Sequence, residues 1–211
     1  MPNKIRLSIW SDYVCPFCYL EKPVIDRLKE SFSGQIDVRW HAYELRPDPL
    51  PTLDPAGDYL RSTWQRAVHP MASERGMALS LPPLQPRSRK ALEAERFARD
   101  FGRGDAMHNA LFEAYFQYGR NIGDVAVLAD IGRSVGLDGD SLAAALAQGC
   151  YADNIEHERR EAERMGITAV PAIVVHRAQQ SPLEGRMVIG AQPYEVLSHL
   201  VGQIQMESEL V

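Results

Sequence analysis

Two cysteines separated by two residues stand where a strand pattern gives way to a helix pattern, and this feature constrains the fold most. Residues 4–10 alternate apolar and polar side chains, as a strand with one buried face does. Residues 14–30 carry apolar side chains at helical spacing, and Cys15 and Cys18 fall at the start of that helix. A strand–CxxC–helix context favours a redox-active thiol pair.

The start of a helix is a place where a cysteine becomes reactive. The first backbone N–H groups of a helix lack intrahelical acceptors, and the helix dipole places partial positive charge there. Both effects stabilise a thiolate, which is the nucleophile in thiol–disulfide exchange. We therefore expect Cys15 to attack and Cys18, one turn further along, to resolve the mixed disulfide. Pro16 fits the first turn because no N–H is needed there.

Two other uses of a CxxC pair are disfavoured. Zinc takes four ligands, usually with a second close pair, whereas the third cysteine, Cys150, stands alone and the six histidines form no pair at ligand spacing. A structural disulfide across two residues closes a very small loop and stabilises little. We therefore expect no metal site, and we expect Cys150 to be a small buried hydrophobic residue.

Composition and charge exclude several classes of function. The 211 residues have a net charge of −5, which disfavours nucleic acid because phosphate binding needs a basic face. No apolar run approaches the ~20 residues of a membrane span. The N-terminal residues lead straight into the strand pattern without the apolar segment of a secretory signal. We therefore expect a cytoplasmic protein, in which a disulfide is transient.

The segments that follow predict a βαβ unit and then a block of helices. Residues 36–42 alternate again, so residues 4–42 have the strand–helix–strand order that usually means parallel pairing. Residues 46–55 hold four prolines and are expected to form an irregular connector. From residue 57 to residue 149 the apolar spacing is helical.

Strand patterns return only near the C-terminus. Residues 172–175 and 186–189 are rich in β-branched and aliphatic side chains, and the polar loop between them predicts an antiparallel pair. Residues 194–205 then have helical apolar spacing. Pro171 falls at the first position of the returning strand, where no ladder donor is lost. The order is βαβ, helices, then ββα.

Several charged residues are open to more than one interpretation. Asp12 and Glu21 flank the CxxC, where they would tune Cys15 or relay protons, or they would simply be surface residues. We expect residues 87–90 to form a solvated helix start and residues 156–160 an exposed charged face. Asp140 is expected to cap a short helix.

Together these motifs resemble the DsbA family of thioredoxin-like oxidoreductases, and most closely its FrnE-like members. A CxxC combined with a Val-Pro before the third strand is specific for the thioredoxin superfamily. The resembling stretches cover nearly the whole chain and are residues 11–20, 39–47, 111–116, 122–124, 166–172 and 190–194.

The resemblance implies an α/β thioredoxin-like fold with a large all-helical insertion. Residues 1–54 and 166–211 would form the discontinuous thioredoxin-like domain, and residues 55–165 the helical insertion domain. It also implies that the Val170–Pro171 bond is cis and lies beside the CxxC, where its backbone pairs with an extended substrate.

The residues between the cysteines are expected to tune the pair. Pro16 and Phe17 occupy these positions, and Phe17 stands where DsbA itself has a histidine. Phenylalanine cannot stabilise a thiolate by charge. We therefore expect the reduction potential of this pair to lie nearer the reducing end of the range found in thioredoxin-like oxidoreductases.

The implied activity is thiol–disulfide exchange with protein thiols and disulfides or with small thiols. Glutathione would serve as a redox co-substrate, and no bound cofactor is expected. The alternative is a glutathione-dependent isomerase or transferase related to 2-hydroxychromene-2-carboxylate isomerases and kappa-class glutathione transferases, which carry serine at the position of Cys15. Near the expected groove, Lys22 is the only cation close in sequence. A non-enzymatic partner-binding module is a third possibility, which the intact CxxC disfavours.

Overall fold

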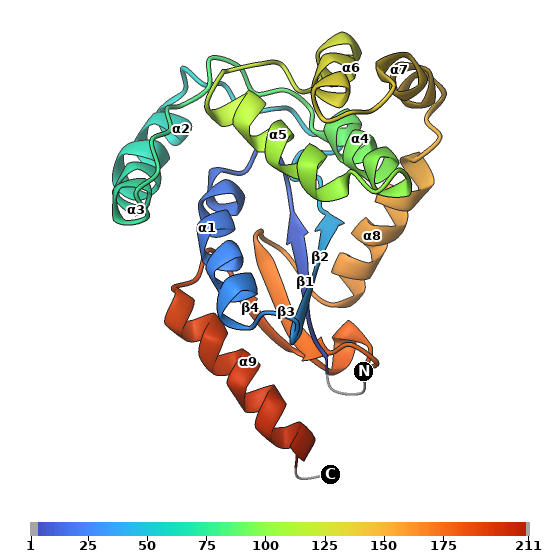
Figure 1. The fold of residues 1–211 in the computed structure, drawn as a ribbon. Coiled ribbons are helices and arrows are strands. Elements are labelled where there is room, and N and C mark those ends of the chain that lie inside the picture. Colours follow the sequence, from blue (N-terminus) through green and yellow to red (C-terminus); the bar gives the residue numbers. More distant parts are fainter. Residues whose placement is uncertain (1–3, 210–211) are drawn as a thin grey trace.

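A four-stranded mixed sheet in the order β2-β1-β3-β4 forms the centre of the computed structural model (Figure 1). The structure describes residues 4–209. Residues 1–3 and 210–211 of the predicted thioredoxin-like domain lie outside it, so the expectation about the N-terminal segment falls partly outside the described residues. The strands are β1 (Ile5–Ser11), β2 (Ile36–Ala42), β3 (Ala172–Arg177) and β4 (Arg186–Ile189).

The pairing within the sheet confirms the predicted strand arrangement. β1 pairs in parallel with β2 and antiparallel with β3, and β3 pairs antiparallel with β4. Every second residue of β1 points to the same face, so Ile5, Leu7 and Ile9 enter one core together. This regular alternation is the reason why β1 could be located in the sequence.

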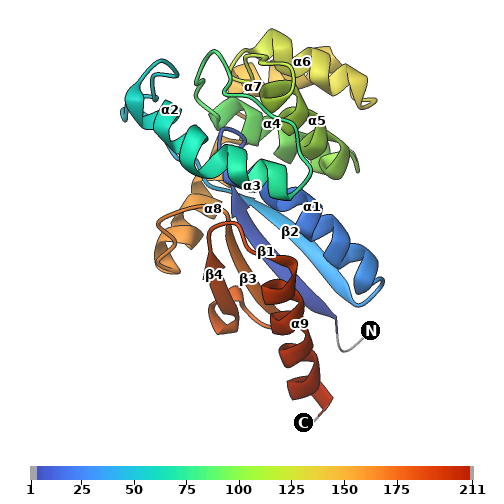
Figure 2. The same ribbon diagram turned by 90° about the vertical axis from the view of Figure 1, so that its left-hand side faces the viewer.

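Two helices pack on one face of the sheet (Figure 2). They are α1 (Pro16–Ser31), which continues through Pro23, and α9 (Tyr194–Glu209). Ile25 and Leu28 of α1 and Leu197 and Val201 of α9 are fully buried against the apolar side chains of β1 and β3. Burying each such side chain contributes roughly 1.5–3 kcal/mol, so α1 is firmly attached to the strand that precedes it.

A block of helices lies between β2 and β3 in the chain. Figure 1 shows most of it at the end of the sheet where β1 leads into α1, while α8 lies beside the sheet. Its elements are α2 (Asp58–Thr63), a π-helical turn (Trp64–Val68), α3 (His69–Glu74), α4 (Arg89–Asp100), α5 (Gly104–Phe116), α6 (Val125–Ser134), α7 (Gly139–Gln148) and α8 (Ala152–Arg164).

The insertion shares one hydrophobic core with the end of the sheet that carries the cysteines. That core contains Cys15 and Cys18 together with residues of every helix from α2 to α8. Trp10, Trp40 and Trp64 are buried. These features confirm the expected thioredoxin-like fold with a helical insertion. Among residues 4–209, no helix is both long and apolar enough to cross a membrane.

Two local predictions were wrong. The start of α7 is capped by Asp138, whose carboxylate accepts hydrogen bonds from the backbone N–H groups of Asp140 and Ser141, so Asp140 is not the cap. Cys150 is exposed rather than buried. It follows Gly149, whose φ of 68° ends α7 in the left-handed conformation and turns the chain toward solvent.

Candidate dithiol active site

The two cysteines lie in the first turn of α1, as predicted. Cys15 is the residue immediately before the helix, and Pro16 occupies the first helical position. The Cys15 N–H donates to the Asp12 carbonyl at 3.1 Å, while the N–H groups of Cys18 and Tyr19 donate to the Cys15 carbonyl at 3.2 and 3.3 Å. The turn that joins the cysteines is therefore held by backbone hydrogen bonds.

The surroundings of the two thiols differ. Both are free, and Cys15 is 4 % exposed whereas Cys18 is 0 % exposed. Burial raises the pKa of the Cys18 thiol, and the neighbouring Cys15 thiol raises it further. The main chain of Asp12 opposes this rise in pKa. Cys18 is thus held in the thiol form inside the protein.

The predicted Val170–Pro171 segment lies against the first cysteine. The bond between these residues is cis, as expected. The Cys15 Sγ donates to the Val170 carbonyl at 3.5 Å, and the Pro171 carbonyl accepts from the Gly190 N–H at 2.8 Å. The structure therefore brings together Cys15, Cys18, Val170 and Pro171 from distant parts of the sequence.

The residues between the cysteines are less buried than the cysteines themselves. Pro16 and Phe17 are both half-buried, and Phe17 packs on the edge of the core shared with the insertion. The Phe17 ring brings no charge to the pair. The two predicted tuning residues thus form the more accessible part of the CxxC turn.

Asp12 is a buried residue, which decides between the two interpretations left open by the sequence. Its carboxylate accepts hydrogen bonds from the backbone N–H groups of Val14 at 3.3 Å and Leu45 at 2.7 Å. Burial raises the pKa of Asp12 to about 6, although these bonds and one from Ser88 act in the opposite direction. Asp12 therefore joins the CxxC turn to the connector between β2 and α2, which in the structure comprises residues 43–57.

Glu21 is also buried and ties α1 to two other segments. Its Oε2 accepts from the Arg75 guanidinium at 2.8 Å and from the Gln192 N–H at 2.9 Å. Burial raises the pKa of Glu21 to about 7, against the opposing effect of Arg75. Glu21 thus links the CxxC helix to the end of α3 and to the segment between β4 and α9.

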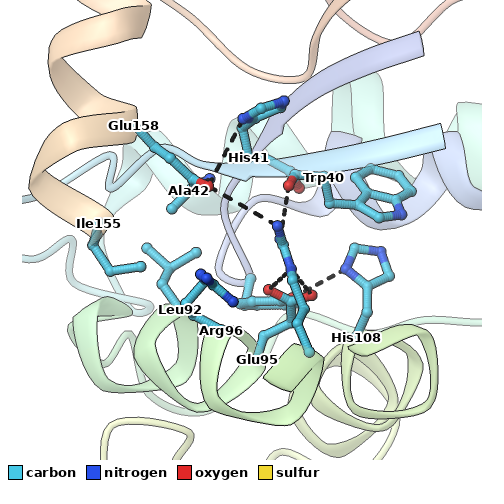
Figure 3. A pocket seen from close by; sticks show the side chains of 12 residues that line it. Trp40, His41, Ala42, Leu92, Glu95, Arg96, His108, Ile155 and Glu158 are labelled. Atoms are coloured by element: carbon cyan, nitrogen blue, oxygen red, sulfur yellow. Dashed lines mark hydrogen bonds and ion pairs between the residues drawn. The ribbon is translucent and has the colours of Figure 1, made fainter. Parts of the chain in front are cut away.

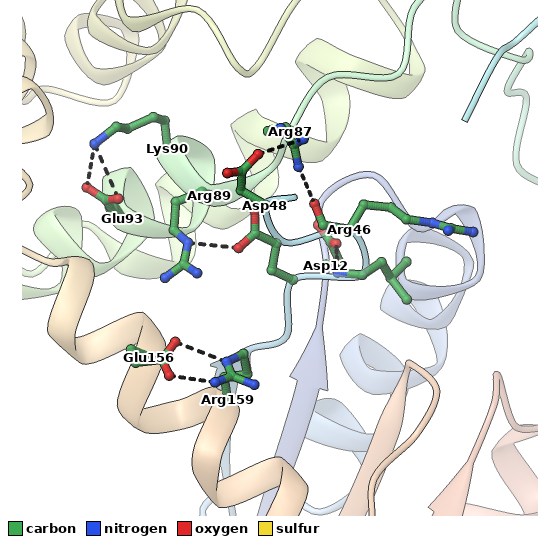
Figure 4. Close-up of polar contacts among 11 residues, drawn as sticks. Asp12, Arg46, Asp48, Arg87, Arg89, Lys90, Glu93, Glu156 and Arg159 are labelled. Carbon is green, nitrogen blue, oxygen red and sulfur yellow. Dashed lines mark hydrogen bonds and ion pairs between the residues drawn. The ribbon is translucent and has the colours of Figure 1, made fainter. Parts of the chain in front are cut away.

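The basic segment at residues 87–90 is not the solvated helix start that the sequence predicted (Figure 4). Arg89 pairs with Glu44 at 2.8 Å, and the Glu44 side chain is only 3 % exposed. Lys90 pairs with the buried Glu93 at 3.1 Å. Buried carboxylates need counter-charges, so these cations are drawn onto the connector and the neighbouring helices.

A second buried polar cluster covers the free edge of β2 (Figure 3). Arg99 donates to the Trp40 carbonyl at 2.7 Å and pairs with Glu95 at 2.7 Å. Glu158 accepts from the Ala42 N–H, so its side chain is turned inward rather than lying on the predicted exposed face. Side chains of α4 and α8 therefore satisfy backbone groups that an edge strand would otherwise leave unpaired.

Two other features near the site were not foreseen. The Tyr13 hydroxyl lies 3.0 Å from Nδ1 of the buried His108. A cavity of about 390 Å³ beside α1 is lined in part by Arg27 and Arg75. Neither arginine belongs to a recognisable sequence motif, and Arg75 reaches this position only through the fold of the insertion. Across residues 4–209, no group of three or more His, Cys, Asp or Glu side chains is arranged to hold a metal ion.

Comparison with known protein families and sequences identifies relatives of this chain. The model of the DSBA-like thioredoxin domain family matches residues 6–202. An uncharacterized protein of Bacillus subtilis (strain 168), YwbO, is 35% identical over 179 residues, which cover 81% of this chain and 86% of that protein.

Solved structures share the fold over almost the whole chain. A probable DsbA oxidoreductase from Streptomyces coelicolor has a TM-score of 0.77 and 26% identity, covering 96% of this chain and 91% of its own. The cytosolic disulfide reductase DsbM from Pseudomonas aeruginosa, solved with GSH, has a TM-score of 0.66 and 20% identity, covering 97% and 98% of the two chains.

Proposed function

Because the chain belongs to the DSBA-like thioredoxin domain family and is a disulfide oxidoreductase of that type, we propose that Cys15 and Cys18 are its redox-active dithiol. The observation that supports this proposal most is the position of Cys15. Its sulfur lies at the start of α1 and 3.5 Å from the Val170 carbonyl, while Cys18 is buried one turn behind it.

The proposed reaction divides the work between the two thiols. The Cys15 thiolate attacks one sulfur of a substrate disulfide, so that a mixed disulfide forms and the other substrate sulfur leaves as a thiolate. Cys18 then loses its proton and attacks the Cys15 sulfur, which releases the second substrate thiolate. The dithiol has given two electrons to the substrate, and the reverse sequence oxidises a substrate dithiol.

We propose extended polypeptide segments as one class of substrate. Such a segment would pair with the backbone at Val170 and Pro171, next to the Cys15 sulfur. Small thiols such as glutathione would be the redox co-substrate, with no bound cofactor, and the DsbM structure with GSH offers a precedent in the same fold. The cytoplasm is the proposed location, and FrnE-like proteins are the proposed subfamily.

One observation favours a second candidate, a glutathione-dependent isomerase or transferase. The cavity beside α1 is lined by Arg27 and Arg75, which would suit an anionic thiol, although Glu74 and Glu195 line it too. However, Arg75 already bonds to Glu21 and to the Gln192 carbonyl, and Arg27 lies 3.8 Å from the centre of the Tyr194 ring. Because both arginines already have partners, they are poorly available to bind the two carboxylates of glutathione. The oxidoreductase therefore remains the primary proposal.

Substitution of single cysteines tests the proposed roles. Cys15→Ser is expected to abolish turnover in an insulin-reduction assay with a small-thiol reductant, because no nucleophile remains. Cys18→Ser is expected to accumulate mixed disulfides with substrate, because the resolving thiol is gone. Cys150→Ser is the matched control, since this thiol is exposed and outside the site. Near-normal turnover of Cys15→Ser would refute the assignment.

A further inference from the structure

The carboxylate of Asp12 joins three segments of the chain beside the cysteines. The side chain is inaccessible to solvent. One oxygen accepts from the Val14 N–H of the CxxC turn at 3.3 Å, and the other accepts from the Leu45 N–H of the connector at 2.7 Å. The Ser88 side chain, at the start of α4, also lowers the pKa of the carboxyl group. The side chain therefore fixes the position of its own backbone.

That backbone contacts both cysteines. The Asp12 carbonyl accepts the Cys15 N–H at 3.1 Å, which sets the residue at the start of α1. The Asp12 main chain also lowers the pKa of the Cys18 thiol, against the effect of burial. Both contacts are made in the dithiol form described here, in which the cysteines are free. A shift of the Asp12 backbone would alter both contacts together.

We propose that Asp12 is a positioning residue for the dithiol. Its carboxylate holds in place the main chain that precedes Cys15 and Cys18. This inference rests on the proposed function, because its effect is measured on that pair. The competing explanation is that Asp12 only anchors the helical insertion. A variant of Glu44 separates these two explanations, because Glu44 pairs with Arg89 of α4 at 2.8 Å and belongs to the same connector as Leu45.

The test compares Asp12→Asn with Glu44→Gln in a redox titration against glutathione buffers. In Asp12→Asn the amide nitrogen that replaces one oxygen cannot accept from a backbone N–H. The CxxC turn then loses one of the hydrogen bonds that fix its main chain, and the dithiol–disulfide equilibrium is expected to shift about fivefold from that of wild type. The pH profile of Cys15 alkylation should move in the same variant. Glu44→Gln should leave both measurements unchanged while lowering the unfolding temperature.

An unshifted equilibrium in Asp12→Asn, or an equal shift in Glu44→Gln, would overturn the positioning role. If Asp12→Asn does not fold, Ser88→Ala replaces it, because this variant removes a side chain that favours the charged form of the Asp12 carboxyl group. A smaller shift supports the role, and no shift overturns it. A wild-type protein that forms no Cys15–Cys18 disulfide would refute the proposed function itself, whereas a cycling wild type with an unshifted variant refutes only the positioning role.

Discussion

Cys15 and Cys18 are one helical turn apart, yet the structure surrounds them differently. Cys15 lies at the helix start with its sulfur against the Val170 carbonyl. Cys18 is enclosed, and burial raises the pKa of its thiol. Exchange needs one thiol at the helix start that attacks and a second, buried thiol that resolves the mixed disulfide, so these surroundings suit Cys15 and Cys18 respectively.

The buried carboxyl of Glu21 predicts a specific effect of pH on stability. Burial raises its pKa from 4.5 to about 7 in the folded protein, so the folded state holds this proton more tightly than the unfolded chain. Its contribution to stability is therefore present below the unfolded pKa and is lost as the pH rises through the folded pKa.

Urea unfolding between about pH 4 and pH 8 measures this effect in wild type and Glu21→Gln. The free energy of unfolding of wild type, relative to the variant, should fall by an amount on the order of 3 kcal/mol across this window. Taking the difference removes opposing contributions such as that of His41, whose pKa burial lowers to about 3. A constant difference across the window would contradict the burial of an ionisable Glu21.

The elements that could be predicted from the sequence were those with a characteristic pattern of residue types. Strict alternation located β1 and β2, runs of β-branched and aliphatic residues located β3 and β4, and the CxxC located the start of α1. The cap of α7 was missed because Asp138 and Asp140 stand two residues apart and both are good capping residues. Helix-start chemistry alone does not choose between them.

The contacts that attach the insertion could not be predicted in the same way. Arg89 and Glu44 are far apart in sequence, and each resembles an ordinary surface residue until the fold buries Glu44. The same holds for Arg75 and Glu21. Pairing of distant charges depends on tertiary structure and leaves no periodic signal.

The ion pair at the start of α4 is expected to hold the connector to the insertion. Arg89→Ala leaves the buried Glu44 carboxylate without its partner, so the free energy of unfolding should fall by about 3 kcal/mol. Arg96→Ala is the matched control on the same helix, because Arg96 pairs with an Asp100 side chain that is 46 % exposed. Its effect should stay within about 1 kcal/mol. Equal losses in urea unfolding would contradict the structural role of the Arg89–Glu44 pair.

The whole molecule encloses the CxxC turn in a core shared by the sheet and the insertion. Both cysteines are almost fully buried, and the cavity beside α1 that contains Arg27 and Arg75 is the candidate site for a small anionic thiol. Those arginines already have partners within the protein. The architecture thus favours covalent exchange over a permanent glutathione site.

Calorimetry on the Cys15→Ser, Cys18→Ser double variant separates recognition from covalent reaction. Reduced glutathione should show little saturable binding, because the variant has lost the exchange reaction and the nearby cations are engaged. Micromolar affinity would favour the glutathione-dependent isomerase or transferase. Wild type, by contrast, should be oxidised by oxidised glutathione through a transient mixed disulfide at Cys15.

The central claim is that Cys15 and Cys18 form the disulfide that the protein makes and breaks. Its most direct test is a redox titration of wild type in glutathione buffers, with the disulfide mapped by mass spectrometry of unreduced peptides at each point. We predict a single two-electron transition in which only the Cys15–Cys18 linkage appears, with Cys150 remaining outside it. A transition that maps to Cys150, or a Cys15–Cys18 pair that stays reduced throughout, would contradict the account.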